Sequence, residues 1–341
     1  MKHSKTTTGI LASIFLLILI FDSKTAIGGA SEGLQVCIET VIPSLFPFFV
    51  ASVILTGILM GHQFSGLGPL RKRLGIPQGA ESLFLVGLLG GYPVGAQCIA
   101  QACQAGQLSR QDGERMLSFC SNAGPAFIFG IGATLFPNIW MCWILWLIHV
   151  LSALIVGAMT PTSCAASSLP SGGSAISLSE ALHRSIKTMG MVCGWIVLLR
   201  TIINFCQRWF LWFLPSNLSL CVTGLLELTN GCLLLNQVSS PGLRMELFSL
   251  LLGFGGLCVL LQTKSTLAGS GLKGNAYFPG KLTQSAISYL LALLVQFFLP
   301  EQMRYFPSPY QPLVAITLCA AYYFYSLKGK KSSSIPQILR V

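Results

Sequence analysis

Charged side chains are scarce in this chain. Only 9% of its 341 residues are Asp, Glu, Lys or Arg, whereas 53% are hydrophobic. A soluble domain carries about a quarter charged residues, so this shortage excludes an ordinary soluble protein. Together with a mean hydropathy of +0.70, it indicates an integral membrane protein.

Motifs typical of several other protein classes are also missing. None of the 12 cysteines forms a CxxC pair, and most lie in apolar runs, so we expect neither a metal site nor a disulfide framework. No GxxxxGK[ST] loop occurs, which argues against ATP hydrolysis. Residues 269–274 match GxGxxG but follow a membrane span instead of a strand, so we do not interpret them as a nucleotide site. We therefore predict no cofactor, no catalytic residue and no enzymatic activity.

The net charge of +11 comes from basic residues scattered over short loops. Cytoplasmic loops of membrane proteins carry an excess of Lys and Arg, and this explains the charge without a nucleic-acid partner. The expected environment of the chain is the lipid bilayer.

Apolar runs recur along the whole chain, and their order repeats. Residues 31–160 and 178–300 each contain an amphipathic segment, a span, a short broken run, a polar turn, a glycine-rich span and a last span. Residues 161–177 are predicted to be a linker, and residues 301–341 a C-terminal span with a basic tail. The predicted fold is an all-α membrane bundle of about eight spans plus two re-entrant hairpins, in two inverted repeats.

The ends of these segments carry further expectations. Residues 1–30 have the basic start and apolar core of a secretory signal, but a multispan protein needs no cleaved signal, so we expect a retained span. The amphipathic residues 31–40 and 178–187 are expected to lie along the membrane surface. Residues 245–262 are interpreted as a glycine-rich span.

The positions of the 21 Lys and Arg residues support an inverted arrangement. If each short broken run is a hairpin that returns to the side it entered, most basic residues fall on the cytoplasmic side, with both termini. This count places Arg115 and Lys281 in cytoplasmic loops. Each repeat then has an odd number of full spans, so the second is upside down relative to the first. Secondary transporters are commonly built this way, with broken segments meeting near the bilayer midplane.

The first repeat is broken at GGYPVG and again at SNAGP. In lipid an unpaired peptide group costs several kcal/mol, so helices break only where protein or a water-filled cavity surrounds the break. Glycines let the backbone approach a ligand, and the first N–H groups of a restarting helix favour an anion. The alternatives are a proline kink in a spanning helix and helix packing through small residues. The residues predicted to bind substrate here are Gly91, Tyr92, Pro93, Gly95, Ser121, Asn122 and Gly124.

The second repeat contains a matching break at Glu227, interpreted as the only carboxylate within an apolar run. Ionisable groups inside the membrane are costly and mark ion or proton pathways, so we predict that Glu227 binds a coupling proton or cation. The alternative is that Glu227 lies in water at the mouth of a hairpin. Thr229 and Asn230 are predicted to bind substrate. Arg200 is expected to snorkel or to attract a substrate carboxylate, and His149 to be a packed polar residue.

Four stretches resemble a known family: IPSLFPFFV, LLGGYPVGAQ, the run from Ala105 to Phe136, and LLELTNG. They are similar to the nucleoside-recognition (Gate) domain of YlbJ-type sporulation integral membrane proteins. The resemblance implies a fold of the concentrative-transporter type and a place in the cell membrane of an endospore-forming bacterium, at the outer forespore membrane. It also implies a role in spore formation, where the family is associated with moving dipicolinate into the forespore.

The residues and the resemblance together predict a transporter of a small anionic solute. Two alternatives stay open. One is a nucleoside or ion carrier with the same fold, and the other is a non-transporting membrane scaffold for spore-envelope assembly.

Overall fold

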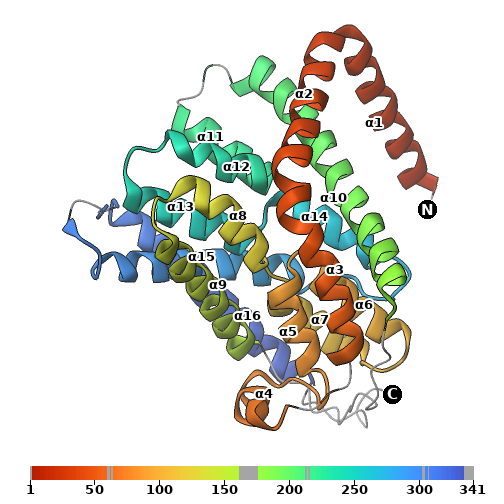
Figure 1. Ribbon diagram of the computed structural model, residues 1–341, viewed down its shortest axis with the longest axis vertical. Coiled ribbons are helices and arrows are strands. Elements are labelled where there is room, and N and C mark those ends of the chain that lie inside the picture. Colours follow the sequence, from red (N-terminus) through yellow and green to blue (C-terminus); the bar gives the residue numbers. More distant parts are fainter. Residues whose placement is uncertain are drawn as a thin grey trace.

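The structure, a computed structural model, is built from helices (Figure 1). It describes residues 2–59, 62, 64–160, 176–211, 213, 216–301, 304–305 and 307–333. Most of the predicted linker and the last residues of the predicted basic tail lie outside these ranges. Within the described ranges, five segments are long and apolar enough to cross a membrane by length and composition: Ser23–Leu59, Arg110–Leu135, Ile139–Met159, Leu178–Phe210 and Pro241–Thr266. The prediction of an all-helical membrane protein is confirmed.

The chain starts with α1 (Lys2–Phe21), turns at Asp22 and continues into α2 (Ser23–Val36). A π-helical turn (Cys37–Val41) joins α2 directly to α3 (Ile42–Leu59), so the two form one long column in Figure 1. The expectation that residues 31–40 form a separate surface segment is therefore wrong. Both π turns and prolines are recognised causes of helix kinks, and this turn ends two residues before Pro43. Residues 178–187 are likewise the first turns of the 29-residue α10 (Leu178–Cys206).

Helices α2 and α10 lie side by side in close backbone contact. A Cβ atom on Gly29 would lie 2.7 Å from Thr201 Cα, and one on Gly33 would lie 2.8 Å from Val197 Cα. Glycines four residues apart lie on one helix face and let two membrane helices approach closely. Arg200 Nε donates to Glu32 at 2.9 Å across this interface, so Arg200 has a partner within the chain.

This contact predicts a difference between two neighbouring glycines. Gly29→Ala should destabilise the protein by about 1–3 kcal/mol, because the added methyl group meets the α10 backbone. Gly28 has open space at its Cβ position, so Gly28→Ala is the matched control and should be neutral or slightly stabilising. Thermal unfolding of the two variants in detergent measures the difference. Equal melting temperatures would contradict the packing described here.

The first half continues with α4 (Gly68–Leu74), α5 (Glu81–Gly90) and α6 (Val94–Gln104). The 10-residue α5 is about 15 Å long, roughly half the thickness of a bilayer core. The chain turns back between Gly91 and Pro93, so that a Cβ on Gly95 of α6 would lie 3.0 Å from Gly87 Cα of α5. Helices α5 and α6 thus form a helical hairpin at the predicted break.

Next come α7 (Arg110–Cys120) and α8 (Pro125–Leu135), with residues 121–124 outside any helix, and then α9 (Ile139–Met159). Arg115 was predicted to lie in a polar turn. It is instead buried in α7, where Nη1 donates to Leu74 O at 2.6 Å and Nη2 to Gly75 O. These bonds satisfy carbonyl groups at the end of α4, which explains why a cation is buried there.

The second half begins, after α10, with a hairpin of α11 (Ser216–Leu226) and α12 (Leu228–Leu234). It continues with α13 (Pro241–Phe254) and α14 (Gly256–Thr266). The span predicted for residues 245–262 lies within the segment Pro241–Thr266, which is long and apolar enough to cross a membrane, but it contains a break that the sequence did not predict. Gly255 and Gly256 adopt φ values of 81° and 78°, which glycine reaches readily and other residues do not, so the helix breaks between α13 and α14.

The last helices are α15 (Tyr277–Gln296) and α16 (Tyr310–Ser333). The loop before α15 contains the GxGxxG match, and it holds a carboxylate from the first half of the chain. Glu114 accepts hydrogen bonds from the backbone N–H groups of Lys273, of Gly274 at 2.9 Å and of Asn275 at 3.0 Å. This loop connects the two halves through its backbone donors.

Candidate functional site

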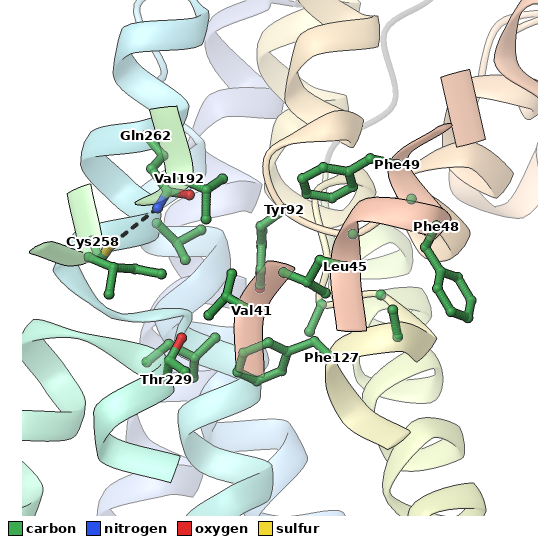
Figure 2. A pocket seen from close by; sticks show the side chains of 18 of the residues that line it. Val41, Leu45, Phe48, Phe49, Tyr92, Phe127, Val192, Thr229, Cys258 and Gln262 are labelled. Atoms are coloured by element: carbon green, nitrogen blue, oxygen red, sulfur yellow. Dashed lines mark hydrogen bonds between the residues drawn. The ribbon is translucent and has the colours of Figure 1, made fainter. Parts of the chain in front are cut away.

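Three chain breaks from both halves of the chain meet at one small cavity, of about 40 Å³. Its walls include the backbone at Gly90–Tyr92 between α5 and α6, at Ala123–Gly124 between α7 and α8, and at Glu227–Thr229 between α11 and α12. Apolar side chains of α3, α8, α10 and α14 close it, and Figure 2 shows Val41, Tyr92, Phe127 and Thr229 around the same space.

The volume of the cavity limits what this conformation can hold. One water needs roughly 10–15 Å³ measured in this way, so the cavity has room for a few waters or an ion. Pockets that bind metabolites span roughly 300–1,000 Å³. A metabolite would fit only after the hairpin turns and the surrounding helices move apart.

The predicted site residues separate into two groups. Gly91, Tyr92, Gly124, Glu227 and Thr229 line the cavity. The remaining five do not line it, and they are Pro93, Gly95, Ser121, Asn122 and Asn230.

Two residues of the second group have structural roles at the start of α6. Pro93 precedes the first turn of α6, and a Cβ on Gly95 would lie 2.3 Å from Cys120 O. Gly95 therefore lets α6 approach the end of α7.

Glu227 is the N-cap of α12 and is 1% exposed. Its carboxylate accepts hydrogen bonds from Thr229 N at 3.0 Å, Asn230 N at 2.7 Å and Asn230 Nδ2 at 2.6 Å. The alternative position in water at a hairpin mouth is therefore wrong. A capping carboxylate is stabilised by the positive end of a helix, so the first donors of α12 are already paired within the chain.

Lys281 is the residue whose position differs most from the sequence prediction. It was expected in a cytoplasmic loop, but it is 1% exposed within the first turns of α15. Its Nζ lies 3.2 Å from Asn122 Oδ1 and 2.6 Å from Gln284 Oε1. Nζ also lies 5.3 Å from the ring centre of Tyr92 and 5.9 Å from that of Tyr277.

Among the described residues, the groups that contact the Lys281 ammonium are neutral. They are amide oxygens and aromatic rings, which attract cations, and Lys281 forms no salt bridge within the described ranges. A buried charge without an ionic partner is costly. This position therefore favours the approach of an anion.

Asn122 and His149 link the broken helix α7–α8 to its neighbours. Asn122 Oδ1 also accepts from Gln284 Nε2 at 2.9 Å, and Asn122 Nδ2 donates to Phe119 O at 2.7 Å. Ala123 N–H donates to His149 Nε2 at 3.0 Å. His149 is a packed polar residue, as predicted, and it satisfies a backbone donor that the break leaves without a helical partner.

A signal for Lys281 was present in the sequence. Lys281, Gln284, Ser285 and Ser288 are spaced at i, i+3, i+4 and i+7, which places them on one face of a helix. In the structure this polar face points into the bundle, and Ser288 Oγ donates to Ser152 Oγ of α9 at 2.8 Å.

The expectation that Glu227 is the only carboxylate within an apolar run is also wrong. Glu246 lies in α13 and is 0% exposed, and it accepts a hydrogen bond from Gln296 Nε2 of α15. It lies away from the cavity, in the wall of a separate groove.

A comparison with known proteins shows one extensive similarity. The chain is 27% identical to the sporulation integral membrane protein YlbJ of Bacillus subtilis (strain 168), in an alignment that covers 86% of this chain and 84% of that protein. No protein-family model matches the chain, and no solved structure matches it. The expected resemblance to YlbJ-type proteins is thus confirmed over most of the chain, whereas the Gate domain assignment stays a prediction.

Proposed function

We propose that the protein is a secondary transporter that carries a small anionic metabolite between its two helical hairpins. The observation that supports this most is the convergence of two hairpin turns, from separate halves of the chain, on one cavity with a buried cation nearby. Broken helices that meet around a site within the membrane are the usual construction of secondary transporters.

The order of elements supports an arrangement in two inverted repeats, residues 31–160 and 178–300. In the first, the hairpin α5–α6 precedes the broken helix α7–α8, and in the second, the hairpin α11–α12 precedes the broken helix α13–α14. The charge pattern of the loops supports opposite orientations with cytoplasmic termini, because most Lys and Arg residues stay on one side even without Arg115 and Lys281.

The preference for an anion follows from two positive groups near the cavity. Lys281 lies behind Tyr92, whose own atoms line the cavity. Gly124, Ala126 and Phe127 at the start of α8 also line it, so this helix turns its positive end toward the same space.

Tyr92 is placed to control access to Lys281. Its hydroxyl group donates to Leu252 O at 3.2 Å, near the end of α13, while its ring covers the ammonium group. We propose that movement of the α5–α6 turn away from α13 breaks this bond. The substrate carboxylate can then reach Lys281, and the other residues predicted to bind substrate surround it. In the same proposal, Glu227 binds the coupling proton or cation from the opposite wall of the cavity.

Dipicolinate is the substrate that we propose, with import into the forespore across its outer membrane. It combines a flat aromatic ring with two carboxylates, which suit the Tyr92 ring and the Lys281 ammonium. The similarity to a protein named for sporulation supports the same setting.

Uptake of labelled dipicolinate into vesicles that contain the purified protein tests the proposal. We expect uptake that unlabelled dipicolinate inhibits and that uridine at the same concentration does not. Inhibition by uridine would favour a nucleoside carrier. Absence of any uptake, in vesicles where the protein is folded, would favour the scaffold.

A further inference from the structure

A groove on the outside of the bundle is separate from the proposed transport site. It lies among α11, α13, α15 and α16 and has a volume of about 540 Å³. Helix α15 packs against both α13 and α16. The walls are mostly apolar, with side chains such as Leu250, Leu282, Val314 and Leu318.

Helices α13 and α15 are antiparallel along this groove. A Cβ on Gly253 would lie 2.6 Å from Ser285 Cα, and Ser285 Oγ donates to Leu250 O at 2.8 Å. Near the other end, Gln296 of α15 reaches Glu246 of α13. The start of α13 therefore lies beside the end of α15.

This arrangement makes the groove amphipathic along its length. Its polar end is the end at which Glu246 and Gln296 lie. The start of α16 is at this end, because Tyr289 donates through its hydroxyl to Gln311 Oε1 at 3.3 Å. Phe254 and Phe278 lie at the opposite end. Tyr310 is 75% exposed at the start of α16, a position typical of aromatic residues at the membrane–water interface.

Glu246 is the acidic group of the polar end, and one of its oxygens has no partner. Gln296 Oε1 accepts from Tyr305 N at 2.6 Å, so the amide of Gln296 can only donate to Glu246. That bond occupies Glu246 Oε1. Glu246 Oε2 is buried without a hydrogen-bond partner among the described residues, which is unfavourable unless a ligand supplies a donor.

We infer that the groove binds a bilayer phospholipid with a primary ammonium headgroup. The ammonium N–H donates to Glu246 Oε2 and neutralises its charge, and an acyl chain lies along the apolar wall toward Phe254 and Phe278. The exposed apolar side chains of α16, including Val314 at 59% exposure, place the opening of the groove toward lipid. A quaternary ammonium headgroup has the same charge but no N–H to donate, so the site distinguishes the two.

Native mass spectrometry of the full-length protein, reconstituted in equal amounts of phosphatidylethanolamine and phosphatidylcholine, tests this inference. We expect the wild-type protein to retain phosphatidylethanolamine about tenfold more than phosphatidylcholine, as one charge-assisted hydrogen bond allows. Glu246→Gln should remove the preference. Glu39→Gln, at an exposed carboxylate on another helix, should keep it.

A second variant tests where the lipid lies. Val314→Trp should fill the groove from α16 and reduce the retention of both lipids. Equal retention of the two lipids by the wild-type protein would overturn the inference. So would a full preference in Glu246→Gln, or unchanged retention in Val314→Trp. These outcomes do not depend on transport, and the wild-type and Val314→Trp results decide the matter even if Glu246→Gln fails to fold.

Discussion

Replacing Lys281 with methionine should reduce dipicolinate uptake by roughly 30-fold or more, because a buried charged partner of the substrate carboxylate is worth about 2–5 kcal/mol. Methionine keeps most of the length of the side chain and removes its charge. The measurement is the initial rate of uptake into vesicles with equal amounts of folded protein. The protein itself should stay folded, since replacement of a buried charge by an apolar side chain is often neutral or stabilising.

Lys273 is the matched control for this variant. It lies in the loop before α15 with an exposed side chain, so Lys273→Met should keep the wild-type rate. If Lys281→Met also kept the wild-type rate, Lys281 would not contact the substrate and the preference for anions would lose its main support.

Replacing Glu227 with glutamine should separate uptake driven by a gradient from exchange. Glutamine retains one oxygen that can accept from the start of α12, but it cannot take up a proton or balance a cation. We expect uptake driven by a proton or sodium gradient to fall by about tenfold or more, since ionisable groups at membrane depth carry this coupling. Exchange of labelled for unlabelled substrate needs no gradient and should persist.

Comparing gradient-driven uptake with exchange distinguishes a role of Glu227 in coupling from its role as the cap of α12. Loss of a capping interaction costs about 1 kcal/mol of stability and would lower both kinds of transport together. Glu39→Gln, at an exposed carboxylate that does not line the cavity, is the control and should keep the response to the gradient. Gradient-driven uptake at the wild-type rate in Glu227→Gln would remove Glu227 from the coupling site.

Features that depend on local sequence were predictable. Helix α9 (Ile139–Met159) is the last span predicted in the first repeat. An apolar run of spanning length forms one helix in lipid, and Asn138 caps its start. The breaks after Gly90 and Cys120 also occur where expected, since glycine and proline interrupt helices through their own backbone geometry. Where glycine occurs without proline, as at Gly255, the sequence was ambiguous, and the break inside the predicted span was not foreseen.

Features that depend on distant neighbours required the tertiary structure. Lys281 follows a Pro–Gly pair and other lysines in sequence, which is typical of a loop. A Cβ on Gly280 would lie 2.5 Å from Ser118 Cβ, and this close approach of α15 to α7 brings Lys281 to Asn122. The pairs Arg200–Glu32 and Glu246–Gln296 are likewise formed by residues far apart in sequence, and only the packing of their helices brings them together.

The sequence by itself determined that this is a helical membrane protein with paired breaks, because composition, hydropathy and backbone-breaking residues act locally. It also carried the resemblance to YlbJ-type proteins, through the stretches around those same breaks. Only the tertiary structure decided which charges are buried and which breaks share a cavity. A buried charged side chain is stable only when partners compensate for the loss of water. Those partners are far away in sequence, so no local sequence pattern identifies them.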